Sequence, residues 1–295
     1  MGNVVVIGAN RFIGFHLCMA FLDEGTEVKG YTHSAHKEED DLQEEMKFFL
    51  GRNANYASTE VGESLDMITS ETDIVYFTYF DGGDFYHPDF LRQEMQKAQQ
   101  VLIQALNKCR QLNIRFVFVS TMRVFGDQQR KIEETTIPEP DSSEGRLYVH
   151  FERIIEKYKD DGWPIIIVRT PTLYGPWQPL SMCYSKNIAG YEEAFNIMEG
   201  TDFIIYIEDA VSALRRCKTA AYSYEVVHLV EEKLQPWSAA GANITHMEVK
   251  EEAAQEKYEI SRKAKELLNF SSRVTAKEGI YLQKKHMRTF FLPFH

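Results

Sequence analysis

The chain has 295 residues, of which 44% are hydrophobic, and its formal net charge is −11. This length accommodates one large α/β domain or a main domain with a smaller lobe. The acidic balance disfavours binding to nucleic acids or to anionic membranes, and no apolar run is long enough to span a bilayer. The four widely separated cysteines are typical of reduced thiols in a cytoplasmic protein, and we expect no metal site.

The first fourteen residues predict a strand, a glycine turn and a helix. Residues 4–7 are apolar and mostly β-branched, and apolar residues recur at helical spacing after the turn between Gly8 and Gly14. Such a turn presents free backbone N–H groups and the positive end of a helix dipole, which together bind phosphate. Arg11 stands where the usual dinucleotide fingerprint has a third glycine. We therefore expect an altered nucleotide site here, and no signal peptide before this first strand.

Strand-like and helix-like segments alternate along the rest of the first half. Strand-like segments are residues 27–32, 73–79, 115–121 and 164–169. Apolar residues recur at helical spacing in residues 90–112 and 148–158. Strands separated by helices favour a parallel sheet covered on both faces, with ligand at the carboxyl ends of the strands. The predicted fold class is α/β, a Rossmann-like doubly wound parallel sheet with a small C-terminal substrate lobe.

The predicted domain division follows from a change of pattern after Gly175, where the alternation becomes less regular. We expect a dinucleotide-binding domain over residues 1–170, to which residues 201–232 return. Residues 171–200 and 233–295 would then form the substrate lobe.

Five segments form an ordered series along nearly the whole chain. They are residues 8–14, 118–126 (FVSTMRVFG), 169–176 (RTPTLYGP), 206–211 (YIEDAV) and 261–280, which contains SRKAKELLNF and EGI. In this order the segments resemble those of the extended short-chain dehydrogenase/reductase family. That family comprises the NAD(P)-dependent sugar-nucleotide epimerases and dehydratases.

The resemblance implies a set of catalytic positions. In such enzymes a Ser or Thr orients the substrate, a Tyr transfers the proton, and a Lys binds the nicotinamide ribose and lowers the pKa of the Tyr. Thr121 and Tyr148 occupy the first two positions, and Glu152 replaces the Lys. A carboxylate one helical turn away would raise the pKa of the Tyr. Glu152 is therefore either a new general base or a solvated helix carboxylate.

The resemblance also implies the residues that hold a dinucleotide. They are Gly8, Asn10, Arg11, Phe12, Ile13, Gly14, Thr32, His33, Arg52, Tyr79, Tyr148 and Pro171. Thr32 replaces the acidic residue that binds the adenosine ribose, and Arg52 with the preceding glycine is taken for the Gly-Asp pair that contacts adenine. Arg11, His33, Lys37 and Arg52 could gather around a 2′-phosphate. The expected cofactor is NADP or NAD, with NADP favoured.

Three functions stay open. The first is an NAD(P)-dependent epimerase, dehydratase or reductase acting on a sugar-nucleotide-like or small carbonyl substrate. The second is a catalytically degenerate NAD(P)-binding sensor or scaffold, which the missing Lys and the short segment between Pro176 and Asp209 favour. The third is RNA binding, as in the chloroplast stem-loop-binding proteins with a similar start, against which the acidic balance counts. By resemblance we expect a homodimer formed through the helices of residues 90–112 and 148–158.

Overall fold

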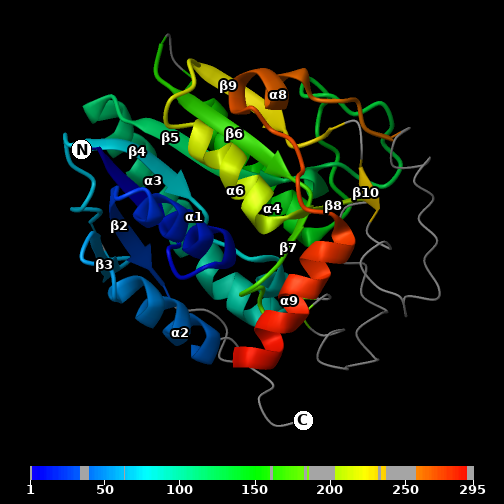
Figure 1. Ribbon diagram of the computed structural model, residues 1–295. Coiled ribbons are helices and arrows are strands. Elements are labelled where there is room, and N and C mark those ends of the chain that lie inside the picture. The colour runs from blue at the N-terminus through cyan, green and yellow to red at the C-terminus, as the bar shows by residue number, and fades with distance from the viewer. Residues whose placement is uncertain are drawn as a thin grey trace.

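The structure is a computed structural model that describes residues 2–33, 40–62, 64–159, 162–182, 185, 203–231, 234–236 and 257–290 (Figure 1). Its centre is a seven-stranded sheet in the order β3-β2-β1-β4-β5-β6-β9, with every neighbouring pair parallel. The strands are β1 (Asn3–Ile7), β2 (Glu27–Thr32), β3 (Tyr56–Glu60), β4 (Thr72–Phe77), β5 (Arg115–Thr121), β6 (Ile165–Thr170) and β9 (Tyr224–His228). The sheet confirms the predicted Rossmann-like fold.

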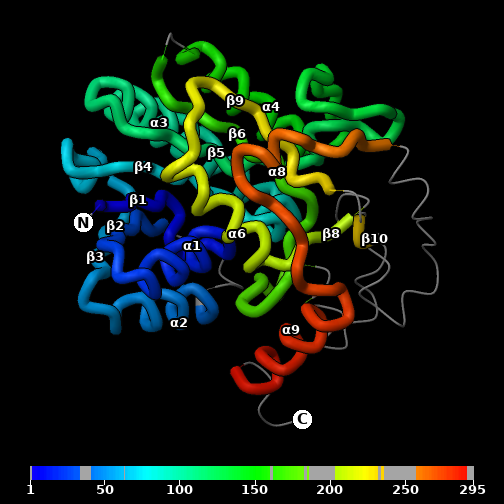
Figure 2. Tube along the Cα trace, turned by 45° about the horizontal axis from the view of Figure 1, so that its top comes forward, coloured from blue at the N-terminus to red at the C-terminus, as the bar shows by residue number. Residues whose placement is uncertain are grey.

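Helices cover both faces of the sheet (Figures 1 and 2). On one face lie α1 (Phe12–Asp23), α2 (Asp40–Gly51) and α6 (Ile207–Arg216), with α8 (Arg262–Leu268) against α6. On the other face lie α3 (Pro88–Leu112) and α4 (Ser143–Glu156). Side chains alternate across each strand, so Val4 and Val6 of β1 pack on the α1 side, whereas Val5 and Ile7 pack on the α3 side. Two apolar layers result, as a doubly wound sheet requires.

The start of α4 is set by its cap. The Ser142 hydroxyl accepts a hydrogen bond from the backbone N–H of Gly145 at 3.0 Å, which satisfies one of the free donors of the first turn. Glu144, Tyr148 and Glu152 are spaced four residues apart, so they follow one another along one side of α4.

A second, smaller sheet begins at the carboxyl edge of the first, directly after β6. It has the order β10-β8-β7, formed by β7 (Thr172–Tyr174), β8 (Phe203–Tyr206) and β10 (Gln235–Pro236). Helix α9 (Ala276–Phe290) packs on it through Ile280 and Tyr174. Of the predicted substrate lobe, residues 183–184, 186–200, 233, 237–256 and 291–295 lie outside the described residues. The domain division stays a prediction.

The strand β3 was not predicted from the sequence. Its residues Tyr56–Glu60 are half-buried or exposed at the edge of the sheet, so they lack the apolar run of the inner strands.

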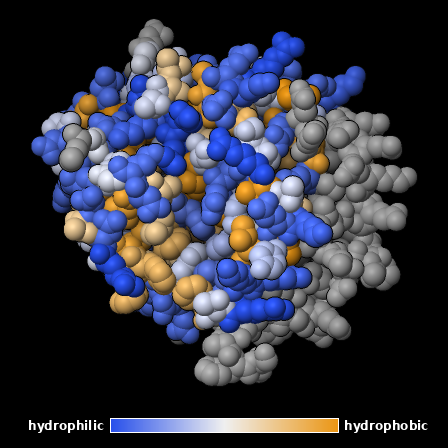
Figure 3. Space-filling view, viewed as in Figure 1, coloured by the Kyte–Doolittle hydropathy of each residue, from blue (hydrophilic) through white to orange (hydrophobic). Residues whose placement is uncertain are grey.

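Figure 3 shows hydrophilic residues over most of one face and a patch of apolar ones over the region of α1 and α2. Among the described residues, no helix is both long enough and apolar enough to cross a membrane.

Candidate active site

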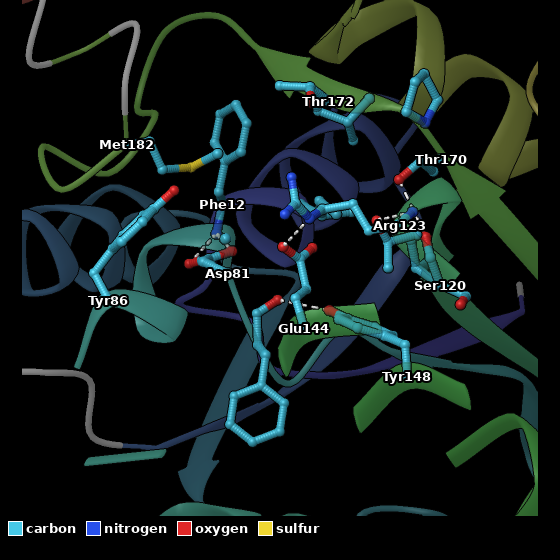
Figure 4. Close-up of a pocket in the computed structure, with 17 residues that line it drawn as sticks. Phe12, Asp81, Tyr86, Ser120, Arg123, Glu144, Tyr148, Thr170, Thr172 and Met182 are labelled. Carbon is cyan, nitrogen blue, oxygen red and sulfur yellow. Dashed lines mark hydrogen bonds and ion pairs between the residues drawn. The ribbon is translucent and has the colours of Figure 1, made fainter. Parts of the chain in front are cut away.

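A cavity opens at the carboxyl ends of β5 and β6, where a doubly wound fold places its ligand (Figure 4). The register of these strands sets Thr121 beside Thr170, and β7 follows at once. Predicted site residues that line this cavity are Phe12, Ile13, Thr121, Tyr148 and Pro171. The structure therefore brings the start of α1, the end of β5 and the helix α4 to one place.

Two cavity residues, Glu144 and Arg123, were not identified from the sequence. Glu144 forms an ion pair with Arg123, with 3.1 Å between its Oε2 and the Nε of Arg123. Arg123 lies in the short 3-10 helix Met122–Val124, directly after β5. The available signal was the spacing, because Glu144 precedes Tyr148 by one helical turn. The cavity thus holds a hydroxyl, a carboxyl, a guanidinium and a phenol.

Burial raises the pKa values of both the phenol and the carboxyl of this cavity. Burial raises the pKa of Tyr148 well above its ordinary value, and the carboxylates of Glu144, Asp81 and Asp84 add to the rise. Burial also raises the pKa of Glu144, against the lowering effects of Arg123 and Thr121. The Tyr148 hydroxyl is 3.4 Å from the carbonyl oxygen of Phe80, to which it donates. At neutral pH, Tyr148 is therefore a proton donor.

Glu152 lies in a buried polar network. The Arg169 guanidinium donates from Nε to Oε1 at 3.0 Å and from Nη2 to Oε2 at 2.7 Å, and the Ser120 hydroxyl donates to Oε1 at 2.6 Å. The Nη1 of Arg169 is 3.0 Å from the Nε2 of His228. Glu152 is 7% exposed, so it is not a solvated carboxylate. Ser120 separates this network from the cavity, which it lines.

The glycine turn has the tight geometry of a strand-to-helix connection. Gly8 has φ of +90°, and a Cβ on Gly14 would lie 1.9 Å from the Gly8 carbonyl oxygen. The Asn10 side chain joins the turn to the end of β2, since its Nδ2 donates to the His33 carbonyl at 2.8 Å and its Oδ1 accepts from the His33 N–H at 3.3 Å. Only glycine fits at positions 8 and 14.

Arg11 points into the protein. Its side chain is ion-paired with Asp81, Nε to Oδ2 at 3.2 Å, and with Asp84. Both carboxylate oxygens of Asp81 accept from the Phe12 N–H, each at 3.1 Å. Asp81 and Asp84 belong to the loop and short 3-10 helix (Gly82–Tyr86) that follow β4. A chain carboxylate therefore lies at the N-terminus of α1.

Arg52 does not join the group of basic residues expected around a 2′-phosphate. Arg11 is 1% exposed, and Lys37 lies outside the described residues. Arg52 is exposed over the ring of Phe48 and follows α2 at the amino end of β3, the edge opposite the glycine turn. The unpredicted strand β3 is the physical reason, because Arg52 precedes this strand instead of following it.

Three predicted residues lie at the carboxyl ends of β2 and β4. The Thr32 hydroxyl is 3.4 Å from the Thr59 carbonyl oxygen. The ring of His33 stacks on that of Tyr79, with centroids 3.7 Å apart and an angle of 10° between the planes. Both rings are buried. They therefore fill the space between the ends of these two strands.

Comparison with protein families matches residues 4–229 to the NAD dependent epimerase/dehydratase family. The chain belongs to this family. The resemblance to extended short-chain dehydrogenases/reductases is thereby confirmed, and the matched residues extend from β1 to just beyond β9.

The individual proteins that resemble this chain share 30% or less of its sequence in the three comparisons that follow. The uncharacterized UDP-glucose epimerase YtcB of Bacillus subtilis (strain 168) is 30% identical over 201 residues, which span 63% of this chain and 61% of that protein. The UDP-glucuronic acid 4-epimerase of Bacillus cereus, solved with UDP-glucuronic acid and NAD, has a TM-score of 0.78 at 21% identity, covering 98% of this chain and 100% of that one. The dTDP-glucose 4,6-dehydratase of Bacillus anthracis str. Ames, solved with NAD, has a TM-score of 0.75 at 15% identity, covering 99% and 98%. At these identities the two solved structures show the shared fold.

Proposed function

We propose that this protein is an NAD-dependent enzyme of the epimerase/dehydratase type that acts on a UDP-sugar. The observation that carries the proposal is the pairing of Thr121 with Tyr148 in one cavity at the carboxyl edge of the sheet. The similar proteins add to it, because one is named a UDP-glucose epimerase and another was solved with UDP-glucuronic acid and NAD.

The residues of the cavity suit proton transfer to and from a sugar hydroxyl. Tyr148 stays protonated at neutral pH and donates its proton to a substrate oxygen, while the Thr121 hydroxyl orients that oxygen. Glu144, as a carboxylate paired with Arg123 in the same cavity, accepts the proton that a substrate hydroxyl loses when its carbon is oxidised. When bound, NAD supplies the acceptor and donor of hydride. Arg123 adds a positive charge at the wall of the cavity, suited to an anionic group of the substrate.

The glycine turn fits an anionic cofactor, because it already binds an anion of the chain itself, the Asp81 carboxylate. Phe12 and Ile13 would hold the cofactor phosphates, and Tyr148 and Pro171 the nicotinamide end. The expected preference for NADP finds no support in the positions of Arg11 and Arg52. We therefore propose NAD, tested by comparing fluorescence titrations with NADH and NADPH.

The decisive experiment is a product assay. Purified protein is incubated with NAD and either UDP-glucose or UDP-glucuronic acid, and the sugar products are separated by chromatography, with Tyr148→Phe as the control. A new sugar nucleotide that requires Tyr148 supports the proposal. Unchanged substrate with both sugars contradicts it.

A catalytically silent nucleotide-sugar-binding protein is the second candidate. The ion pair between Glu152 and Arg169 favours it, because Glu152 stands at the position of the family lysine and its carboxylate is bound in a buried network. In that case UDP-glucose binds but is not converted.

Homodimerisation through α3 and α4, and a cytoplasmic location, remain proposals. Light scattering of the purified protein tests the homodimer.

A further inference from the structure

The carboxylate of Asp81 occupies the position at which a helix N-terminus binds phosphate. Phe12 is the first residue of α1, so its N–H has no partner within the helix. This N–H donates to both oxygens of Asp81 at 3.1 Å. The positive end of the helix dipole adds to the attraction. One N–H cannot serve this carboxylate and a cofactor phosphate at full strength at once.

Two charged residues, Arg11 and Asp84, hold Asp81 in this position. Arg11 pairs with it through Nε at 3.2 Å, and the same guanidinium pairs with Asp84. Asp84 in turn accepts from the backbone N–H of Asp81 at 2.8 Å, which forms a capping box with Asp81 at the start of the 3-10 helix. All three side chains are buried, with Arg11 and Asp84 each 1% exposed. The carboxylate is therefore a built part of the turn.

The charges of this cluster oppose a second anion. Arg11 contributes one positive charge, and Asp81 and Asp84 contribute two negative ones. The pyrophosphate of a dinucleotide would bring two further negative charges to the same N–H group. Like charges in a buried site repel strongly, because the low dielectric screens them poorly. Arg11, which stands in the place of the third glycine, thus holds the Asp81 carboxylate at the start of α1.

We propose that Asp81 is an internal competitor for the cofactor phosphate and sets the affinity of this protein for its dinucleotide. The dinucleotide binds the turn only when the Asp81 carboxylate withdraws from Phe12. The inference rests on the proposed function in taking NAD as the cofactor.

The test is direct binding of NADH, measured by calorimetry and by nicotinamide fluorescence, to the wild type and to two variants. Asp81→Ala removes the competing carboxylate, and Asp81→Asn removes its charge while keeping its size. Asp89→Asn is the matched control, because it makes the same charge change on an exposed residue at the start of α3. Circular dichroism shows whether each variant is folded.

We expect Asp81→Ala to bind NADH roughly ten- to a hundredfold more tightly than the wild type, the range that one hydrogen bond to a charged group corresponds to. Asp81→Asn should gain less, and Asp89→Asn should bind as the wild type does. Equal or weaker binding by the folded Asp81→Asn variant overturns the inference, even if Asp81→Ala fails to fold.

Binding of UDP-glucose to the same proteins separates the two proposals. If UDP-glucose and NADH bind but NADH affinity does not respond to Asp81, the competitor role alone is wrong. If no variant binds NADH, both the competitor role and the proposed cofactor are wrong.

Discussion

Replacing Glu152 with Lys would restore the lysine that the family places four residues after its tyrosine, yet we expect this change to destabilise the protein severely. Glu152 and Arg169 are 7% and 4% exposed, and two hydrogen bonds join them. Removing one partner of a buried ion pair costs about 3–5 kcal/mol. Lys at this position also sets a second positive charge beside Arg169, so the loss should be at least this large. Since whole domains are stable by about 5–15 kcal/mol, the effect is severe.

The assay is urea unfolding followed by tryptophan fluorescence, for which the buried Trp163 and Trp177 provide the signal. Glu156→Lys is the matched control, because Glu156 lies one turn further along α4 and is exposed. We expect this control to change the free energy of unfolding by less than about 1 kcal/mol.

A double variant tests whether the loss comes from the broken pair. Replacing both Glu152 and Arg169 with Met removes both charges while keeping much of the volume, so stability should largely return. If Glu152→Lys and Glu156→Lys have the same free energy of unfolding, the buried pair of Glu152 and Arg169 contributes little to stability.

Other changes test the cavity, the turn and the buried histidine. Tyr148→Phe should lower turnover of a UDP-sugar by about 10²–10⁴-fold, with an unchanged melting temperature. Burial raises the pKa of Glu144, so the folded protein holds this proton more tightly than the unfolded chain and loses stability as the pH rises above about 4.5. Glu144→Gln should remove that loss in thermal melts at several pH values. Gly14→Ala should abolish soluble expression, because its Cβ would lie 1.9 Å from the Gly8 carbonyl oxygen. Burial lowers the pKa of His16 from 6.5 to about 4, so stability should fall as the pH drops through that interval, and less so in His16→Gln.

The elements that the sequence predicted well are those with strong local patterns. The strand, turn and helix of residues 3–23 are specified by an apolar run, two glycines and helical spacing, all within a short stretch. The edge strand β3 lacks such a pattern, because its Tyr-Ala-Ser-Thr-Glu sequence faces solvent over much of its length. Because β3 was not predicted, Arg52 was expected at the ligand edge of the sheet. It precedes β3 and therefore lies at the opposite edge.

The parts of the site that escaped sequence reasoning depend on contacts between distant residues. Arg11 and Asp81 are separated by two helices and three strands, so nothing in the local pattern of either residue indicates their ion pair. Likewise, Glu152 meets Arg169 only because β6 lies beside β5 in the sheet. The sequence did identify Arg11 and Glu152 as departures from the family pattern. Their partners became known from the fold.

The carboxylate at the start of α1 has a consequence for how the empty protein behaves. A ligand that binds only the folded state normally stabilises it in proportion to its affinity and concentration. Here the chain supplies its own anion to Phe12, so the turn is held in place whether or not a dinucleotide is present. Because a dinucleotide must displace this anion, its measured affinity is lower, and a given concentration of it stabilises the fold less. The protein should therefore tolerate a cell depleted of cofactor, and should survive purification without added nucleotide.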